Sequence, residues 1–360
     1  MIKNENGRVI NLILNLFLKL LITIALVIIV AFITMKVLGV ELKVSYENGK
    51  LSLQKQKEFK VQVIDDEYPN IADYQEDSYF YNQLDDNAKA IYLGIQDNLE
   101  NMKSGNYRID FGTRFNTLLQ TKEGQESLSI SYQDAVDALK QDTPGLFYID
   151  FSKVYLNTYS LTEGNTTTHT VFIDQGDNQN YFAKGFNTKS DVVRAVAQVE
   201  EVRNLVVSAI PEGSSNFEKI LYVHDWLVDN LSYDETLSKD NRSNVFGALV
   251  EKSVTCQGYA KAFKYIIDSL SVPCILVKGD ATNSQGTTEK HVWNYVQIND
   301  GWYAVDVTWD DPIIIGSGEL SPEIKYTYFC KGKSFLDNHV EEGTLPGSEE
   351  YFKYPELVSD

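Results

Sequence analysis

The longest hydrophobic run in this chain of 360 residues extends from Leu20 to Met35 and contains no charged side chain. Apolar residues from Ile10 to Leu18 lengthen it, with two asparagines among them. Lys19 and Lys36 can keep their charges at the two membrane surfaces while their stems lie in the apolar layer. Because a helix needs about 20 residues to cross a bilayer, we predict a short tail and one transmembrane anchor over residues 1–38.

Two other interpretations of this run remain open. It could form a buried helix of a soluble domain, or the apolar part of a cleaved signal peptide that begins with Lys3 and Arg8. We prefer an uncleaved anchor, because residues 33–40 contain no Ala-x-Ala-like cleavage site. Lysines flank the run on both sides and do not fix its orientation. The short tail before the run and the large domain after it favour a single-pass protein of the cell membrane with an extracytoplasmic domain.

The hydrophobic pattern changes after the anchor. Residues 39–75 alternate polar and apolar side chains, which predicts short strands or an extended stalk. Residues 76–210 combine helical and strand-like periods, which predicts an accessory α/β region. Its expected elements are helices over residues 79–102, 131–141 and 189–210, and a hairpin with strands over 146–159 and 167–173.

Residues 211–345 show the pattern of an α+β domain. The predicted helices span 217–231 and 258–270, and the predicted strands span 272–279, 291–298 and 302–309. Cys256 lies where the second helix should begin, and Asn299-Asp-Gly301 is a tight-turn signal between the last two strands. The final stretch, residues 337–360, is acidic and turn-rich. It is predicted to be peripheral, with a C-terminal tail over 346–360.

Composition excludes several classes of function. The net charge of −19 would repel the phosphate backbone, so nucleic acid is not expected as a partner. Three cysteines cannot form a complete disulfide framework, and no Cys-x-x-Cys pair predicts a structural zinc site. The four histidines are scattered, and no Asp-x-Asp-x-Asp-Gly pattern predicts a calcium loop. We therefore expect neither a metal nor a cofactor.

Three residues of the C-terminal part have the chemistry of a catalytic triad. Cys256, His291 and Asp306 follow one another in the order nucleophile, base and orienting carboxylate. A thiol needs a neighbouring imidazole to be a strong nucleophile at neutral pH, and the imidazole needs a carboxylate to fix its tautomer and hold its charge. A cysteine in the first turn of a helix also gains from the helix dipole, and the free N–H groups there can stabilise an oxyanion.

The predicted hairpin decides whether His291 and Asp306 can meet. If the turn centres on Asn299 and Asp300, Asp306 lies opposite Trp293, on the same face of the sheet as His291 and diagonal to it. A turn centred one residue later moves the two side chains apart. The sequence thus allows the contact and leaves the register open.

Each of these residues has an ordinary structural explanation when it is considered alone. A cysteine before a helix is usually a small buried residue, a histidine at the start of a strand is usually structural, and an aspartate can simply cap a turn. The order of Cys256, His291 and Asp306 and their flanking residues make a catalytic site much more specific. His224, on the helix predicted over 217–231, is expected to be a packing or hydrogen-bonding histidine.

Several spaced motifs accompany the three candidate residues between about 217 and 312. They are Tyr222-Val-His-Asp-Trp-Leu227, Tyr233-Asp234, Val245-Phe-Gly-Ala-Leu249, Cys256-Gln-Gly-Tyr-Ala260, His291-Val-Trp-Asn294 and Trp302-Tyr-Ala-Val-Asp-Val-Thr-Trp-Asp-Asp-Pro312. In these motifs the chain resembles the transglutaminase-like superfamily, which belongs to the papain-like cysteine enzymes. The region before them is similar to that of bacterial membrane-anchored members.

The resemblance implies a papain-like, transglutaminase-like core, in which a helix that bears Cys256 packs on an antiparallel sheet that carries His291 and Asp306. It implies that Cys256 attacks an amide or peptide carbonyl and forms a thioester, while His291 moves protons and Asp306 orients His291. Water would complete a hydrolysis, as in a peptidase or amidase, and an amine would complete a protein cross-link. The expected substrate is a peptide or protein, with cell-wall and surface proteins as candidates.

The alternative is a catalytically inactive transglutaminase-like domain. Such a domain would keep the fold and serve as a binding or scaffolding module at the cell surface. The complete set of Cys256, His291 and Asp306 favours an enzyme over this module. The sequence does not distinguish a hydrolase from an acyltransferase, because both pass through one acyl-enzyme.

Overall fold

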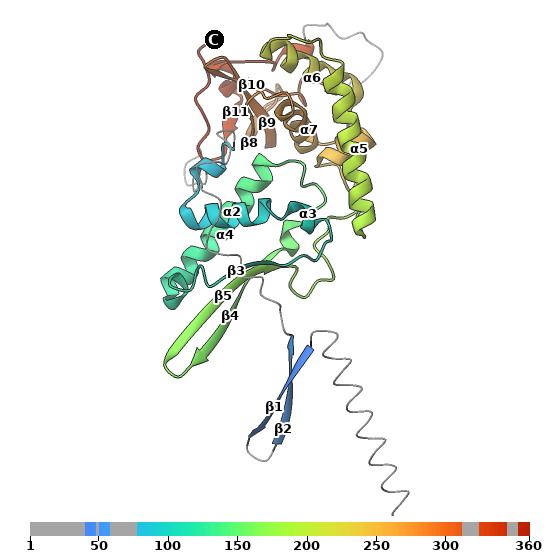
Figure 1. The fold of residues 1–360 in the computed structure, drawn as a ribbon. Coiled ribbons are helices and arrows are strands. Elements are labelled where there is room, and N and C mark those ends of the chain that lie inside the picture. The colour runs from blue at the N-terminus through green and yellow to red at the C-terminus, as the bar shows by residue number, and fades with distance from the viewer. Residues whose placement is uncertain (1–39, 48–49, 58–77, 312–323, 344–351) are drawn as a thin grey trace, which may run out of the picture. The chain divides into compact units, whose positions relative to one another are not determined.

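The computed structural model describes residues 40–47, 50–57, 78–311, 324–343 and 352–360; the remaining residues are grey in Figure 1. The chain divides into two compact units, residues 1–63 and 64–360. In the first unit, β1 (Val40–Glu47) and β2 (Lys50–Lys57) form an antiparallel hairpin, which is the strand alternative of the prediction. The predicted transmembrane segment lies outside the described residues, and no helix within them combines the length and the apolar character that a membrane span needs.

Helices and a three-stranded sheet make up the N-terminal half of the second unit. Its elements are η2 (Tyr81–Gln83), α2 (Asp86–Gln96), α3 (Leu99–Met102), β3 (Ile109–Gly112), η3 (Leu118–Gln120), α4 (Lys122–Asp142), η4 (Phe151–Lys153), β4 (Tyr155–Glu163), β5 (Thr166–Asp174) and α5 (Lys189–Ser208). The sheet has the order β3-β5-β4, and α2 packs against α4 (Figure 1). The predicted hairpin is confirmed as β4 and β5, although β4 begins later than expected because η4 precedes it.

Capping side chains explain where the helices of this half differ from the prediction. The single helix expected over 79–102 is divided into η2, α2 and α3, since Asp85 caps α2 by accepting a hydrogen bond from the Ala88 N–H. The helix expected over 131–141 extends further at both ends, because Thr121 accepts a hydrogen bond from the Gly124 N–H and starts α4 there. Periodicity in the sequence thus locates these helices better than it locates their ends.

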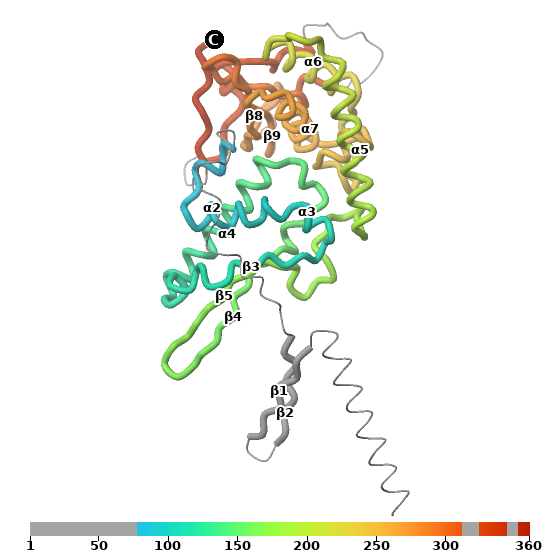
Figure 2. The backbone as a smooth tube through the Cα atoms, viewed as in Figure 1, coloured from blue at the N-terminus to red at the C-terminus, as the bar shows by residue number. Residues whose placement is uncertain are grey.

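The C-terminal half of the second unit packs helices on an antiparallel sheet. Its elements are α6 (Asn216–Asn230), β6 (Ser232–Tyr233), η5 (Gly247–Glu251), β7 (Ser253–Val254), α7 (Cys256–Asp268), β8 (Cys274–Thr282), β9 (Thr288–Ile298), β10 (Gly301–Val305), η6 (Ile324–Tyr326), η7 (Lys333–Asp337) and β11 (His339–Glu341). The sheet has the order β10-β9-β8-β11, and α7 packs on β8 and β9 with α5 and α6 beside it (Figures 1 and 2). The predicted α+β class with antiparallel sheets is confirmed.

Hydrophobic burial between α7 and the sheet fixes the helix that carries Cys256. Tyr259, Phe263, Ile266 and Ile267 are fully buried on one side of α7, at the spacing of a helix face. Burial of one such side chain contributes about 1.5–3 kcal/mol. The position of Cys256, at the start of this helix, is therefore set by the packing of the turns that follow it.

The turn between β9 and β10 has the register that brings His291 and Asp306 close. Ile298 pairs with Gly301, so the turn consists of Asn299 and Asp300, and Asn299 has the positive φ of 55° that such a turn needs. The predicted return strand over 302–309 is wrong at its end, because β10 stops before Asp306. The Asp306 side chain instead accepts hydrogen bonds from N–H groups of the following residues and bends the chain out of the sheet.

The C-terminal stretch is part of the sheet domain, contrary to the prediction that residues 337–360 are peripheral. His339 pairs with Ala281, so that β11 adds a fourth strand beside β8. Leu357 is buried and forms a parallel bridge with Trp302. An acidic, turn-rich composition did not reveal these contacts, because they depend on partners far away in the sequence.

The division into an accessory region over 76–210 and a catalytic domain over 211–345 remains a prediction. The described residues of both regions belong to one compact unit and contribute to one hydrophobic core. At their junction, the ring of Phe147 stacks on that of Phe246, with 5.9 Å between the ring centroids. The two halves therefore share buried surface.

Gly279 is required where β11 pairs with β8. A Cβ atom at this position would lie 2.0 Å from the carbonyl oxygen of Val340 and 2.8 Å from Cη2 of Trp293. We predict that Gly279→Ala displaces β11 and lowers the free energy of unfolding by about 1–3 kcal/mol, as overpacking of a filled core does. Chemical denaturation measures the loss. Gly145→Ala, whose methyl group would meet only the Tyr265 ring, is the control, and equal losses in the two variants would contradict the prediction.

Candidate active site

Cys256 is the first residue of α7, as the sequence pattern predicts, and its side chain is partly exposed. Thr255 precedes it in an extended conformation and makes no side-chain cap; its hydroxyl lies 3.3 Å from the Arg242 carbonyl oxygen instead. The N–H groups of Cys256 and Gln257, at the start of the helix, have no acceptor within it, whereas the Gly258 N–H donates to the Thr255 carbonyl oxygen at 2.8 Å. They are therefore placed to bind a negatively charged oxygen beside the sulfur.

Close backbone packing holds the start of α7. A Cβ atom on Gly258 would lie 2.4 Å from Cβ of Val254 and 2.8 Å from the Arg242 carbonyl oxygen. The Thr255 N–H donates to the same carbonyl at 2.8 Å. Only a glycine fits here without displacing the segments on which the helix start rests.

His291 and Asp306 meet in the buried part of the domain. Nε2 of His291 lies 2.7 Å from Oδ2 of Asp306, and the two residues are 3% and 1% exposed. The other carboxylate oxygen, Oδ1, accepts hydrogen bonds from the N–H groups of Thr308 at 3.1 Å and Trp309 at 3.3 Å. Both oxygens of this buried carboxylate are thus hydrogen-bonded, which is the condition for burying a charge.

The ionisation states follow from these contacts. Burial opposes a charge on His291, but the Asp306 carboxylate and the hydrogen bonds to Asp306 and Cys256 outweigh it and raise the pKa of His291 to about 10. Burial also opposes the charge on Asp306, yet the His291 charge and the hydrogen bonds from His291 and His339 hold the pKa of Asp306 below its usual value. His291 is therefore positively charged, with both ring nitrogens protonated, and Asp306 is negatively charged at neutral pH.

The structure brings the three predicted residues together. Cys256 lies close enough to His291 to contribute to its raised pKa, and because Nε2 of His291 faces Asp306, Nδ1 is the ring nitrogen left for the sulfur. The other two cysteines have different surroundings. Burial raises the pKa of the Cys274 thiol, and it raises the pKa of Cys330 to about 12. Cys256 is thus the thiol with an imidazole beside it.

The sequence pattern does not identify a fourth residue at this site, His339. Its Nε2 lies 3.3 Å from Oδ2 of Asp306, and the residue is fully buried. No motif surrounds His339 in the sequence, and the stretch that contains it has the composition of a peripheral segment. Only the pairing of β11 with β8 brings it to the carboxylate.

The spacing of three of these side chains would also suit a metal ion. One ligand atom from each of His291, Asp306 and His339 lies within 4.8 Å of the other two. In this arrangement, however, both Nε2 atoms face the same carboxylate oxygen, where a proton completes each contact. A metal would also have to displace the proton that His291 holds with a pKa of about 10. We therefore interpret the group as a hydrogen-bonded network.

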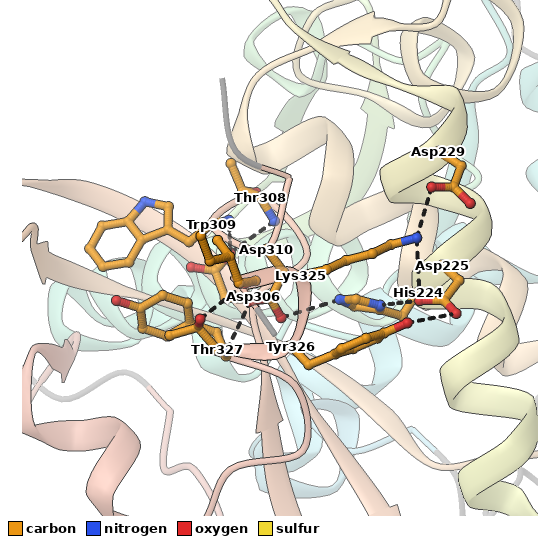
Figure 3. A network of polar contacts seen from close by, with 12 residues as sticks. His224, Asp225, Asp229, Asp306, Thr308, Trp309, Asp310, Lys325, Tyr326 and Thr327 are labelled. Atoms are coloured by element: carbon orange, nitrogen blue, oxygen red, sulfur yellow. Dashed lines mark hydrogen bonds and ion pairs between the residues drawn. The ribbon is translucent and has the colours of Figure 1, made fainter. Parts of the chain in front are cut away.

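A second buried histidine and carboxylate lie next to this site (Figure 3). His224 of α6 and Asp310 are both fully buried, with 3.2 Å between Nε2 and Oδ2. The other oxygen of Asp310 accepts a hydrogen bond from the Tyr328 N–H at 2.8 Å. Burial raises the pKa of Asp310 to about 6, against the lowering effect of His224. The expectation that His224 is a hydrogen-bonding histidine is confirmed.

This second pair connects α6 to the loop that carries Asp306. The Asp310 N–H donates to the carbonyl oxygen of Asp306, and the Asp306 N–H donates to that of Tyr328, both at 3.1 Å. On the other side, Nδ1 of His224 lies 3.1 Å from Asp225, from which the contacts continue to residues 325–326 (Figure 3). The backbone at Asp306 is therefore held by a helix that is distant in the sequence.

Loss of His224 should destabilise the protein strongly. We predict that His224→Phe lowers the free energy of unfolding by about 3–5 kcal/mol, because it leaves the Asp310 carboxylate buried without its partner. Chemical denaturation measures the change. The double variant His224→Phe with Asp310→Leu should recover part of the loss, since it also removes the buried charge.

An exposed ion pair gives the control for this experiment. Lys122 and Glu126 lie 3.7 Å apart on α4, and their side chains are mostly exposed. Glu126→Gln should change the free energy of unfolding by less than about 1 kcal/mol. A loss in His224→Phe that is no larger than this would contradict a stabilising role for the buried pair.

Part of this chain is similar to known proteins. Residues 203–307 match the family described as the transglutaminase-like superfamily. The kyphoscoliosis peptidase of Mus musculus is 24% identical over 123 residues, which are 31% of this chain and 19% of that protein. The kyphoscoliosis peptidase of Homo sapiens is 23% identical over 120 residues, which are 31% of this chain and 18% of that protein. A crystal structure of a TGase is 14% identical over 48% of each chain, with a TM-score of 0.29.

The chain thus spans about a fifth of the length of the curated relatives that it matches. The family match covers α6, α7 and β8 to β10, and it includes Cys256, His291 and Asp306. Residues 203–307 thus carry the match to the transglutaminase-like superfamily that the sequence motifs predict.

Proposed function

We propose that this protein is a cysteine enzyme that acts on amide or peptide bonds through a thioester acyl-enzyme. Cys256 is the nucleophile, His291 the general acid and base, and Asp306 the orienting carboxylate. The observation that carries the proposal is the buried 2.7 Å contact between His291 and Asp306 beside a cysteine at the start of a helix. Stability alone does not explain such a contact, because hydrophobic residues of similar volume often stabilise a core at least as well as a buried charged pair.

The proposed reaction begins with an attack of Cys256 on the substrate. Its Sγ bonds to the carbonyl carbon of the amide, and the electron pair of the C=O bond moves to the oxygen, near the first-turn N–H groups of α7. The C–N bond then breaks as His291 gives its proton to the leaving nitrogen. Asp306 holds the His291 ring in position and stabilises its charge during this step.

The acyl-enzyme is resolved by a second nucleophile. Water or an amine attacks the thioester carbonyl, His291 takes a proton from it, and the C–S bond breaks to regenerate the thiolate of Cys256. Water as the acceptor makes the enzyme a hydrolase, and an amine makes it a cross-linking acyltransferase. A peptide or protein substrate is supported by the two curated relatives, which are named peptidases.

We further propose that the enzyme is anchored in the cell membrane by one N-terminal helix, with its catalytic domain outside the cytoplasm. The charge-free run from Leu20 to Met35 supports the anchor, and the large domain after it supports the orientation. In this proposal, residues 39–75 form a stalk and residues 76–210 an accessory region. Residues 211–345 act on peptides or proteins of the cell wall or cell surface.

Replacement of the nucleophile tests the reaction. We predict that Cys256→Ala lowers the turnover of peptides by about 10⁴- to 10⁶-fold, as removal of a catalytic nucleophile does. Mass spectrometry of a peptide mixture incubated with a primary amine detects hydrolysis and amine transfer in one experiment. Cys330→Ala, which removes a half-buried thiol outside the proposed triad, should keep its turnover. Turnover in Cys256→Ala equal to that of wild type would refute the proposal and leave the binding or scaffolding module.

The pH profile of alkylation tests the partnership of Cys256 and His291. An isolated thiol reacts mainly near and above a pKa of about 8.5. The pKa of His291 is raised to about 10, so the imidazolium charge that favours alkylation of Cys256 should persist up to that pH and be lost above it. His291→Ala should shift the profile to that of an isolated thiol. Cys256→Ala measures the background of Cys274 and Cys330, whose thiol pKa values burial raises. Identical profiles for wild type and His291→Ala would contradict the pairing.

A further inference from the structure

We propose that His339 is a positioning residue of the active site, which holds the Asp306 carboxylate toward His291 by donating a hydrogen bond from Nε2 to the same oxygen. The inference rests on the proposed function, because it assigns a role within the same triad. It adds a residue that lies 33 positions after Asp306 and outside the matched part of the chain.

The geometry around Asp306 shows what His339 adds. Oδ1 is held by two backbone N–H groups, whereas Oδ2 faces two imidazoles, with His291 at 2.7 Å and His339 at 3.3 Å. The His291 ring contacts the carboxylate and is also the imidazole beside Cys256. The His339 hydrogen bond comes from a different strand and restricts rotation of the Asp306 carboxylate about its Cβ–Cγ bond. Without it, Oδ2 would depend on His291 alone, and a change in the His291 ring during catalysis would loosen both groups.

His339 is itself held firmly. Its ring stacks on Phe335 at 4.0 Å between centroids and also contacts the rings of Trp309 at 4.7 Å and Trp293 at 5.0 Å. The residue is fully buried, and Nδ1 lies 2.9 Å from the Asn338 side chain. Aromatic packing of this kind would accept a phenylalanine equally well. The feature that distinguishes histidine is the Nε2 atom that faces the carboxylate.

The protonation of the two histidines gives them different roles. Burial lowers the pKa of His339, and the nearby positive charge of His291 opposes a second charge. A neutral imidazole has one N–H group, and the donor must be Nε2 because that atom faces Asp306. The Oδ1 atom of Asn338 lies 2.9 Å from Nδ1 of His339, and its Nδ2 atom faces the Tyr328 hydroxyl. A half-turn of this amide lets Nδ2 donate to Nδ1 while Oδ1 accepts from the Tyr328 hydroxyl. Oδ2 of Asp306 therefore receives one charged donor and one neutral donor.

Strand pairing of β11 with β8 fixes the position of the His339 backbone. His339 pairs with Ala281 of β8, and Gly279 allows Val340 to approach closely in the same ladder. His291, on the other side of β8, pairs with Gly279. The two histidines thus come from strands that flank β8, and the carboxylate of Asp306 lies within reach of both rings.

Two substitutions separate the donor from the packing. His339→Phe keeps an aromatic ring and removes the donor, while His339→Gln removes the ring and offers a side-chain Nε2 that can donate at a similar position. We expect His339→Phe to slow Cys256 alkylation at neutral pH by about 10- to 100-fold. This is the rate factor that corresponds to the free energy of a hydrogen bond to a charged group. Its pH profile should move toward that of an isolated thiol. His339→Gln should recover most of the rate, and kcat for peptides should follow while KM stays near wild type.

The measurements use the purified full-length protein, with alkylation and thermal unfolding recorded for every variant. Val340→Ala, a change of a neighbouring exposed residue on β11, is the matched control and should behave like wild type. His339→Leu replaces His339→Phe in the comparison if the larger ring prevents folding.

Three results would overturn the inference. A His339→Phe profile equal to that of wild type would show that the donor is dispensable. A His339→Gln variant that is as slow as His339→Phe, with both folded, would show that histidine acts through packing. If wild-type Cys256 itself reacts like an isolated thiol and turns over no peptide, the proposed function fails and this inference with it. Fast wild-type alkylation with an unaffected His339→Phe overturns the role of His339 alone.

Discussion

A carboxylate charge buried inside the sheet domain is the constraint on which this site depends. Asp306 is 1% exposed, and an ionised carboxylate at such depth is very costly unless it is paired and hydrogen-bonded. Four donors face its two oxygens, namely the rings of His291 and His339 and the N–H groups of Thr308 and Trp309. The charge that is stabilised in this way keeps a proton on His291, and His291 faces Cys256. The arrangement of the three candidate residues therefore follows from how one buried charge is solvated by the protein.

The groups that solvate this charge come from distant parts of the second unit. The loop after β10 is held to α6 through Asp310 and His224, and to the segment before η7 through Tyr328. The hydroxyl of Tyr259, on the helix that begins at Cys256, donates to Asp311 in the same loop. The helix that begins at Cys256 and the loop that begins at Asp306 are thus joined by a direct contact as well as through His291. Such a network should respond as a whole, because loss of one contact loosens groups that several others depend on.

Local sequence patterns were sufficient to predict the helix that begins at Cys256 and the hairpin that carries His291. The apolar spacing after Cys256 predicts a helix that begins there, and the Asn299-Asp-Gly301 turn predicts the hairpin that carries His291. Both predictions are confirmed, and of the two registers left open, the structure has the one that favours contact with Asp306. The end of β10 and the place of His339 were not predictable in this way. They depend on side-chain hydrogen bonds and on strand pairing between residues far apart, which periodicity does not record.

The central claim is that the buried Asp306 carboxylate keeps His291 protonated beside Cys256 at neutral pH. The most direct measurement is a pH titration of the His291 ring by ¹H–¹⁵N NMR, in wild type and in Asp306→Asn. The account predicts that both ring nitrogens of His291 remain protonated well above neutral pH in wild type, with a transition near pH 10, and that the transition falls markedly in the variant. A wild-type transition near the ordinary histidine value of about 6.5, or one that is unchanged in Asp306→Asn, would contradict it.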